Sequence, residues 1–318
     1  MSDYPNIAAA ILTRDSAESV ERAIVSAARF CSQIVAVDTG SRDGTPEILS
    51  RLGAETHYFE WRDDFAAARN YSLKFLRADW ALVLDSDEEL DESSMRENLG
   101  LFDDPGLGGI NVLLENALAQ GAKTRHRYTR LFRLLPGIKF EGRIHEQVRP
   151  SIEAAGMRIV ESSILIRHYG YENVTPEKIA RNIELLEREL DEAPTDDWLK
   201  YHLATTAHSA GDAKRAEPLL REIINSARLT RTQIETARIK LAQILLASDD
   251  YAAVPEALNF TSGDADLEGL RISVLAAAAL CMGDVASARA LYASKALDAS
   301  ASVDKNAIET ARKILQIR

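Results

Sequence analysis

The sequence contains few cysteines, no long hydrophobic run and no excess of basic charge. Its two cysteines, Cys31 and Cys281, lie far apart in the chain, which argues against a disulfide framework and favours a reducing compartment. The longest strongly apolar stretch, Val274 to Met282, is too short to cross a bilayer, and the first residues lack the pattern of a signal peptide. We therefore expect a cytoplasmic protein without a transmembrane segment.

The charge balance argues against one large class of partners. With a net charge of −11, the chain has no general basic face with which to bind phosphates, so we do not expect it to bind nucleic acid. A hydrophobic content of 46% and a charged content of 27% are those of an ordinary globular protein. A chain of 318 residues is long enough for two domains, each with its own core.

The first half of the chain alternates short apolar runs with amphipathic segments. We predict strands at residues 7–12, 34–37, 55–61 and 80–84, with helices after Asp15, from Thr45 and over about 64–77. Asp15 and Glu18 have the spacing of a helix capping box, and Thr45 followed by Pro46 is typical of a helix start. Alternating strands and helices predict a parallel sheet with right-handed crossovers.

The organising stretch is WALVLDSDEEL, residues 80–90. Its apolar part predicts a buried strand, and Asp85 and Asp87 follow at the carboxyl end, where open α/β sheets bind their ligands. Two carboxylates at this spacing suit Mg²⁺ or Mn²⁺, and such a cation suits a diphosphate. The alternative is a solvated acidic turn that leads into the next helix.

Two other positions could contribute to the same edge of the sheet. Asp38 ends the second strand, where its carboxylate could bind a nucleotide base or ribose, or could merely stabilise the turn together with Asp43. Arg69 could bind a phosphate or a base edge through its forked guanidinium, or could pair with an aspartate at the surface.

Four segments, in this order and spacing, carry a family resemblance: TRD (13–15), VDTGSRDGT (37–45), WRDDFAAARN (61–70) and LDSDEEL (84–90). Together they resemble the inverting glycosyltransferases of family 2, in the bacterial branch that carries tetratricopeptide repeats. The resemblance implies an α/β GT-A domain, Rossmann-like with a mixed, mostly parallel sheet. It implies that the donor is bound by Thr13, Arg14, Asp15, Asp38, Gly40, Asp43, Arg69, Asn70, Asp85 and Ser86. Arg14, Asp15 and Ser16 depart from the Lys-Asn-Glu of many relatives.

The resemblance also implies a cofactor, a divalent Mn²⁺ or Mg²⁺ bound by Asp85, Asp87 and His168. Asp87 would be the direct ligand on the diphosphate, while Asp85 would contact the ribose or the metal. His168 lies in a late His-Tyr-Gly segment, residues 168–170, and could complete the coordination, since imidazole is acceptable to Mn²⁺. It could equally be a hydrogen-bonded core histidine.

The acceptor side is expected in the basic segment RLFR and the following F-x-G-x-I-H-E, residues 140–146. An inverting transfer needs one base to take the acceptor proton. We assign this role to Glu146, with His145 beside it and Glu141 in reserve; the alternative for Glu146 is a solvated edge strand. A neighbouring basic cluster could face the diphosphate or an anionic acceptor, although a solvated strand face is favoured: Arg125, Arg127, Arg130 and Arg133.

The second half, from Thr175 onward, has a purely helical pattern. Helix pairs are predicted around turns at Asp212, Asp250 and Asp284, a spacing close to the tetratricopeptide period of about 34 residues. We therefore expect a GT-A domain over residues 1–172 and a tetratricopeptide-like helical repeat domain over 173–318. The repeats could bind a peptide or protein, or could only buttress the catalytic domain or form a homodimer.

The leading hypothesis is a metal-dependent, inverting hexosyltransferase that uses a nucleotide-sugar donor, with a UDP-sugar favoured. Its acceptor could be a protein, a peptide or a saccharide. The alternative is a non-catalytic scaffold with a degenerate GT-A domain. A nucleotidyltransferase is disfavoured because no G-x-G-T-R loop follows the first strand; Thr13 and Arg14 stand there instead.

Overall fold

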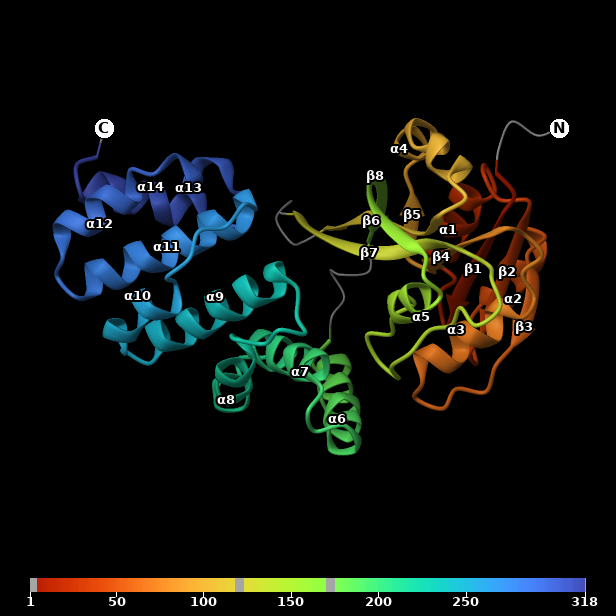
Figure 1. Cartoon of the computed structure of the whole chain (residues 1–318), viewed down its shortest axis with the longest axis horizontal. Coiled ribbons are helices and arrows are strands. Elements are labelled where there is room, and N and C mark those ends of the chain that lie inside the picture. Colours follow the sequence, from red (N-terminus) through yellow and green to blue (C-terminus); the bar gives the residue numbers. More distant parts are fainter. Residues whose placement is uncertain (1–4, 118–122, 170–174, 318) are drawn as a thin grey trace. The chain divides into compact units, whose positions relative to one another are not determined.

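The computed structural model describes residues 5–117, 123–169 and 175–317 (Figure 1). The chain forms two compact units, residues 1–174 and 175–318. The boundary predicted after residue 172 and Gly170 of the late His-Tyr-Gly segment lie outside the described residues. Among the residues that the structure describes, no helix combines the length and apolar character needed to span a bilayer.

The first unit is an α/β domain built on one sheet of eight strands. The strand order is β3-β2-β1-β4-β7-β6-β8-β5. The strands are β1 (Ile7–Thr13), β2 (Gln33–Asp38), β3 (Glu55–Tyr58), β4 (Trp80–Asp85), β5 (Glu88–Leu90), β6 (Leu107–Ala117), β7 (Lys123–Arg133) and β8 (Arg158–His168). The four strands β3, β2, β1 and β4 run parallel to one another, and β7 continues the sheet antiparallel to β4. The mixed, mostly parallel sheet predicted from the sequence is confirmed.

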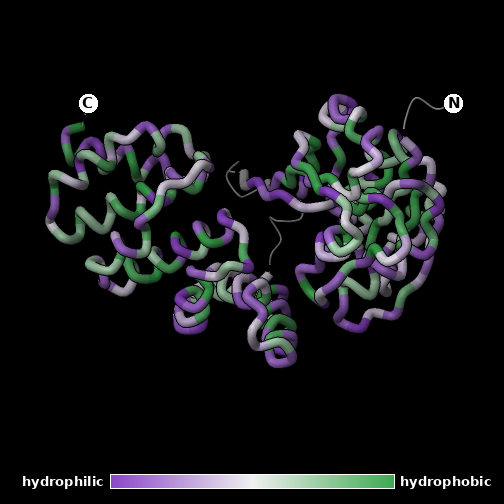
Figure 2. Tube along the Cα trace, in the orientation of Figure 1, coloured by the Kyte–Doolittle hydropathy of each residue, from purple (hydrophilic) through white to green (hydrophobic). Residues whose placement is uncertain are grey.

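Helices cover both faces of this sheet. They are α1 (Val20–Ala27), α2 (Thr45–Arg51), α3 (Phe65–Leu73), α4 (Glu92–Glu97) and α5 (Arg149–Ala154), with a 3₁₀ turn, η1, at Leu99–Asp103. Because successive strand residues face opposite sides, Ile11 packs with the α1 side of the core while Ala10 packs with Ala66 of α3 and Ile152 of α5. The central strands are the most hydrophobic part of this unit, as the green segments in Figure 2 show.

Strand β4 forms where the sequence predicts it because every residue from Trp80 to Leu84 is at most 2% exposed. Full burial of a large apolar side chain such as Leu82, Val83 or Leu84 contributes roughly 1.5–3 kcal/mol to folding. Trp80 anchors the strand, with its ring 4.9 Å from that of Phe102 and the Arg133 guanidinium 4.7 Å from its centroid. The apolar strand therefore holds its polar end, Asp85, at a fixed place on the sheet edge.

The second unit is all helical. Its helices are α6 (Pro176–Glu192), α7 (Asp197–Ser209), α8 (Ala213–Ile223), α9 (Arg231–Ala247), α10 (Val254–Ala257), α11 (Ala265–Cys281), α12 (Val285–Tyr292), α13 (Lys295–Ala299) and α14 (Lys305–Ile314), with a 3₁₀ turn, η4, at Tyr251–Ala253. Asp212 and Asp284 cap α8 and α12 with their side chains, as expected of the turns between paired helices.

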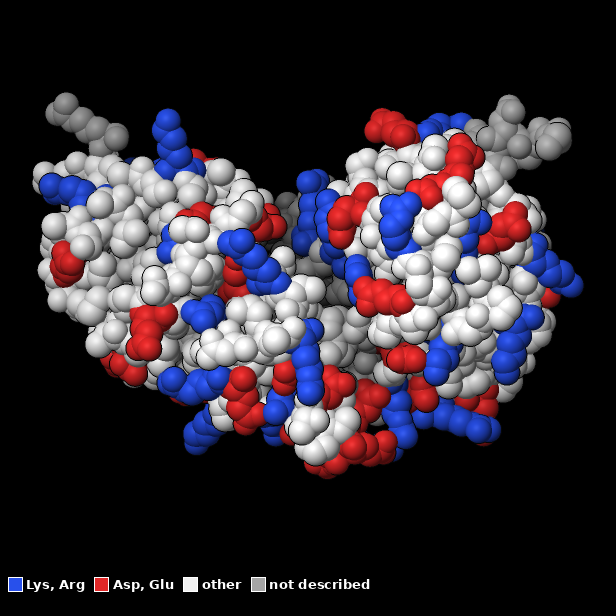
Figure 3. Space-filling model, viewed as in Figure 1, with Lys and Arg blue, Asp and Glu red and all other residues white. Residues whose placement is uncertain are grey.

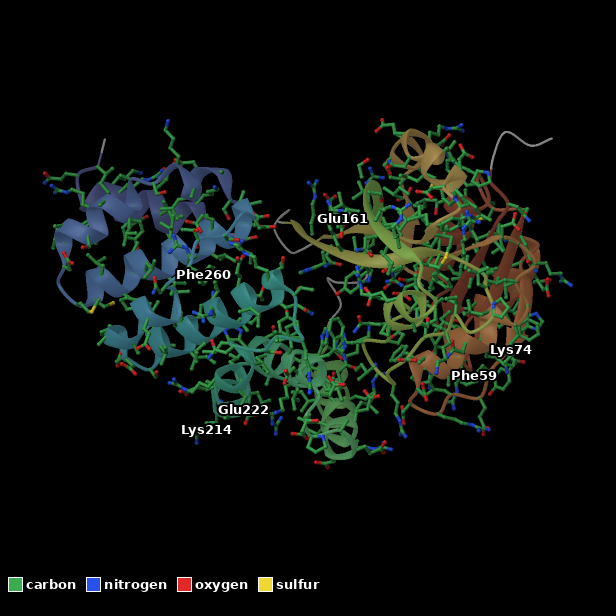
Figure 4. All side chains as sticks on the ribbon, viewed as in Figure 1. Phe59, Lys74, Glu161, Lys214, Glu222 and Phe260 are labelled. Atoms are coloured by element: carbon green, nitrogen blue, oxygen red, sulfur yellow. The ribbon has the colours of Figure 1, made fainter. Side chains whose placement is uncertain are left out.

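The second predicted pair differs from the other two. Its second helix is only the short α10, preceded by η4, and the Asp250 side chain makes no capping hydrogen bond. Pro255 stands within the first turn of α10, where its ring fits, but the segment ends after Ala257. Lys214 and Glu222, both labelled in Figure 4, lie on the better-formed α8 of the first pair.

Candidate active site

The carboxyl ends of the parallel strands are in register, and this brings four separated segments to one edge. Thr13 of β1 pairs with Asp38 of β2, and Asp38 pairs in turn with Tyr58 of β3. On the other side of β1, Leu12 pairs with Asp85 of β4. The predicted site residues at strand ends therefore do meet along one edge.

The turns after β1 and β2 are bound to each other. Asp15 has a left-handed backbone (φ 46°), and its carboxylate accepts from the Arg42 amide at 2.7 Å. Asp43 links the same turns, since it accepts from the Ala17 and Thr45 amides and from the Thr45 hydroxyl. These bonds, that of the Thr45 hydroxyl above all, hold the pKa of Asp43 below its ordinary value.

The capping box expected at Asp15 is wrong, because the Asp15 carboxylate binds the turn after β2 and not the start of α1. Helix α1 begins only at Val20, after Ser19, and no side chain caps it. The Asp15 carboxylate is already used across the two turns. The second helix also differs slightly, because Thr45 is its first residue and its hydroxyl donates to Asp43.

Asp38 is buried, and its carboxylate accepts from the amides of Gly40 and Ser41 and from the Ser41 hydroxyl, the last at 2.7 Å. It therefore holds the turn that follows its strand. Gly40 adopts φ +109°, a conformation that side-chain-bearing residues rarely reach. Tyr58 lies beside this turn with 65% of its surface exposed, an unusual exposure for a tyrosine at the end of a strand.

Five charged side chains of alternating sign form a network with Asp85 at its centre. Arg69 of α3 donates from Nη2 to Asp85 Oδ1 at 2.7 Å and from Nε to Glu146 Oε1 at 2.5 Å. Arg130 of β7 donates from Nη2 to Asp85 Oδ2 at 3.1 Å and to Glu88 Oε1 at 2.7 Å. The order along the network is Glu146, Arg69, Asp85, Arg130 and Glu88. Three of the predicted site residues, Arg69, Asp85 and Glu146, are thus in direct contact.

Burial and charge act against each other in this network. Burial acts to raise the pKa of Asp85, but the two guanidinium groups outweigh it and hold that pKa well below the ordinary value. Burial raises the pKa of Glu88 to about 7, although Arg130 opposes the rise. Asp85 is therefore ionised at neutral pH and fixed by charge-assisted hydrogen bonds on both oxygens.

Glu146 comes from a tight loop, so the alternative of a solvated edge strand is wrong. Glu141 and Gln147 pair their backbones, and the residues between them turn through positive φ at Gly142 (90°) and His145 (53°). The Glu146 side chain is only 11% exposed. Burial lowers the pKa of His145 to about 4, so its imidazole is neutral at physiological pH.

The predicted metal ligands divide into two groups. Asp87 Oδ2 lies 3.4 Å from His168 Nε2, and His168 Nδ1 contacts Asn116 Oδ1 at 2.8 Å, which fixes the ring. This oxygen–nitrogen pair fits two ligands of one cation, and a histidine held through its second nitrogen is usual in metal sites. Both Asp85 oxygens accept from arginines, so Asp85 does not fit as a direct ligand in this arrangement. Within the described ranges, no three metal-ligating side chains form a group.

Other predicted residues have different surroundings. The Asn70 amide makes both of its hydrogen bonds to the Phe140 backbone, so it anchors the loop that carries Glu146. Ser86 Oγ lies 2.8 Å from Ser16 Oγ and links the acidic strand end to the first turn. Arg14 is exposed. Glu141, the reserve base, is exposed and pairs with Lys139.

The basic cluster on β7 does not act as a unit. Arg130 enters the site, contrary to the solvated strand face that the sequence favoured. Arg125 pairs with Glu115, and Arg127 pairs with Glu161 of β8, which is labelled in Figure 4. Arg133 donates to the backbone carbonyls of Leu107 and Asp104.

The sequence analysis assigned no site role to Glu88 or Tyr58, and it favoured a solvated strand face for Arg130. Glu88 and Tyr58 could have been found from their place at or just after a strand end. Arg130 could not, since its contact with Asp85 depends on β7 lying beside β4, and nothing in the local pattern predicts that pairing.

Residues 9–168 match the family described as Glycosyl transferase family 2. The chain belongs to this family, and its family domain is followed by tetratricopeptide-like helical repeats.

Two curated relatives extend the match into the repeats. The chain is 34% identical over 230 residues to a TPR repeat-containing protein of Synechococcus elongatus. The aligned region covers 69% of this chain and 56% of that protein. It is 23% identical over 260 residues to the SPbeta prophage-derived glycosyltransferase SunS of Bacillus subtilis, which covers 79% of this chain and 61% of SunS. The chain thus spans less than two thirds of the length of these relatives.

Among solved structures, the mannosyltransferase PcManGT of Pyrobaculum calidifontis, in complex with GDP-Man and Mn²⁺, matches at 14% identity. Its TM-score is 0.48, with 88% of this chain and 87% of that chain covered. TarS of S. aureus, in complex with UDP-GlcNAc, matches at 15% identity and a TM-score of 0.43, with 87% of this chain and 92% of that chain covered.

Proposed function

We propose that this protein is a metal-dependent, inverting glycosyltransferase that takes a sugar from a nucleotide-sugar donor, with a UDP-sugar favoured. The observation that carries the proposal is the contact of Arg69 with both Asp85 and Glu146. Arg69 is 4% exposed, and its two partners come from the end of β4 and from a separate loop. Buried charges gathered from three segments at the ligand-binding edge of an α/β sheet are typical of a reaction site.

The donor half of the site would consist of the strand ends. The turn held by Asp38 and the exposed Tyr58 ring offer a polar edge and a flat apolar surface for a nucleoside. Asp87 and His168 would hold Mn²⁺ or Mg²⁺, with the remaining ligands supplied by diphosphate oxygens and water. Such a cation would neutralise the charge that develops on the departing nucleoside diphosphate.

Glu146 would act as the base. As sugar C1 is attacked from the face opposite the diphosphate, the new bond forms from the acceptor atom to C1, and the bond from C1 to the phosphate oxygen breaks. The electron pair of the broken bond leaves with the nucleoside diphosphate. The acceptor proton passes to the Glu146 carboxylate, and the anomeric configuration inverts. Arg69 holds the Glu146 carboxylate in place before the acceptor arrives.

The repeat unit would hold a protein or peptide acceptor. Support for this part is its helix-pair architecture, since stacked helix pairs present extended surfaces for peptides. The two charge signs are mixed over the face shown in Figure 3, which accords with a partner selected by shape and local contacts.

Release of nucleoside diphosphate from a panel of UDP- and GDP-sugars, with and without Mn²⁺, tests the proposal. Wild type should release it only with the metal, and Asp87→Ala should lower that rate at least about 100-fold while remaining folded. Asp103→Ala, an exposed aspartate of η1, is the matched control and should keep the wild-type rate. Wild type inactive towards every donor, or Asp87→Ala as active as wild type, would show the proposal to be wrong and would favour a non-catalytic scaffold.

A further inference from the structure

We propose that Arg130 and Glu88 form a positioning pair that fixes the Asp85 carboxylate for donor binding. The inference rests on the proposed function and adds two residues to it. Neither residue acts on the sugar in this account; each acts through Asp85. Three segments meet in the pair: the end of β4, the short β5 and the antiparallel β7.

The first argument is geometric. Glu88 Oε2 accepts from the Asp85 backbone amide at 2.8 Å, while its Oε1 accepts from Arg130 Nη2 at 2.7 Å. The same Nη2 reaches Asp85 Oδ2 at 3.1 Å. Backbone and side chain of Asp85 are therefore both tied to the pair, and the ring of contacts closes on itself.

The second argument concerns what Asp85 would do without the pair. Its side chain is 34% exposed, the most exposed of the five charged groups in the network. Arg69 holds only Oδ1, so loss of Arg130 would leave Oδ2 free to rotate about the Cβ–Cγ bond. Arg130, whose side chain is 13% exposed, supplies the second point that defines the carboxylate plane.

The third argument is that stability alone does not explain the pair. Buried ion pairs are often no more stabilising than well-packed apolar residues of similar size. Arg130 Nε and Arg69 Nη1 are buried without a hydrogen-bond partner in the part of the chain that the structure describes. Each such buried donor without a partner lowers the stability of the folded protein. Charged groups kept at this cost, around a strand end that faces Glu146, indicate a role in the site.

Arg133 shows what an ordinary arginine on the same strand does. Its guanidinium donates to the backbone carbonyls of Leu107 and Asp104 and lies over the Trp80 ring. It contacts none of the five charged groups in any described hydrogen bond or ion pair. Arg133 is therefore the matched control for Arg130, because it is a half-buried arginine of the same strand that binds backbone carbonyls instead of the site carboxylates.

The test compares Arg130→Met/Glu88→Met with wild type and Arg133→Met in the full-length chain. The double variant removes one charge of each sign, so its thermal midpoint should stay within about 4 °C of wild type. Its affinity for UDP and GDP, measured by calorimetry with Mn²⁺ present, should fall about 10- to 100-fold. Arg133→Met should lower the thermal midpoint but leave both nucleotide affinities within about twofold of wild type.

Each outcome is decisive. A folded double variant that binds the nucleotides as wild type does would overturn the positioning role and leave the proposed function standing. Wild type that binds neither nucleotide would overturn both. If the double variant fails to fold, Arg130→Lys replaces it: a lysine keeps the charge but lacks the planar fork, so partial loss of affinity supports the inference and full affinity overturns it.

Discussion

At the scale of single residues, the decisive feature is that Arg69 binds two carboxylates to which the proposed mechanism gives different roles. In the proposed mechanism Asp85 belongs to the donor side and Glu146 to the acceptor side, and one buried guanidinium holds both. Because an arginine is effectively always protonated, Arg69 helps to hold the pKa of Asp85 below its ordinary value. This arrangement favours Glu146 over Glu141 as the base, since Glu141 is exposed and pairs with Lys139.

A pair of conservative substitutions separates these two glutamates. Glu146→Gln keeps the shape of the loop but cannot take a proton, so sugar transfer should fall by about 10²- to 10⁴-fold while UDP affinity changes little. Glu141→Gln, in the same loop, should transfer sugar as wild type does. Rates of nucleoside diphosphate release and calorimetric UDP titrations measure the two quantities. Equal losses in the two variants would contradict the assignment.

His145 makes the stability of the protein depend on pH. Burial holds its pKa at about 4 in the folded chain, against 6.5 for an ordinary histidine. The unfolded chain therefore binds a proton below about pH 6.5 that the folded chain does not, and folding stability falls as the pH drops towards 4. Between pH 7 and pH 5 this one group should cost about 1–2 kcal/mol.

Urea denaturation at pH 7 and pH 5 measures this loss. His145→Asn should reduce it, because asparagine does not titrate and tolerates the left-handed backbone at this position. His126→Asn, at an exposed histidine of β7, should show the wild-type loss. A wild-type loss in His145→Asn would mean that the acid sensitivity comes from other groups.

At the scale of elements, the loop from Phe140 to Gln147 is positioned by two neighbouring residues of α3, Asn70 and Arg69. Asn70 Oδ1 accepts from the Phe140 amide at 2.8 Å, and Asn70 Nδ2 donates to the Phe140 carbonyl at 2.9 Å. The next residue back along the helix is Arg69, which binds Glu146 at the far end of the same loop. Helix α3 therefore fixes the loop at both ends.

Loss of the Asn70 hydrogen bonds to Phe140 should leave the Glu146 side chain less firmly positioned. Asn70→Ala leaves two backbone groups of Phe140 unpaired, which should lower the free energy of unfolding by about 1–3 kcal/mol and reduce sugar transfer severalfold. Asn98→Ala also removes two side-chain hydrogen bonds, but just after the end of α4, and should destabilise without affecting the transfer rate of the folded protein. Transfer that is unchanged in folded Asn70→Ala would contradict this positioning role.

The elements also show where sequence reasoning succeeds. Buried apolar runs such as Trp80–Leu84 predict β1, β2 and β4 because burial imposes a visible pattern. The capping box at Asp15 and the edge strand at Glu146 are wrong because left-handed backbone at Asp15 and His145 redirects the chain. Side chains at strand ends could be predicted, whereas the Arg130 contact depends on an antiparallel neighbour far away in sequence.

At the scale of the whole molecule, the chain joins a family 2 glycosyltransferase domain to a repeat unit. The described candidate site residues all lie between Thr13 and His168, so the proposed donor site lies within the first unit. The repeat pattern was visible because Asp212 and Asp284 cap their helices, while the second pair is shortened at α10. We propose that the second unit binds the acceptor.

The central claim is that the edge formed by Asp85, Asp87, Arg69 and His168 binds a nucleoside diphosphate together with a divalent cation. Calorimetric titration of UDP and of GDP into the full-length protein, with and without Mn²⁺, tests it most directly. One nucleotide should bind at least about tenfold more tightly with Mn²⁺ in wild type, and Asp87→Ala should lose that gain. Absence of binding to either nucleotide, or a gain from Mn²⁺ that survives in Asp87→Ala, would contradict the account.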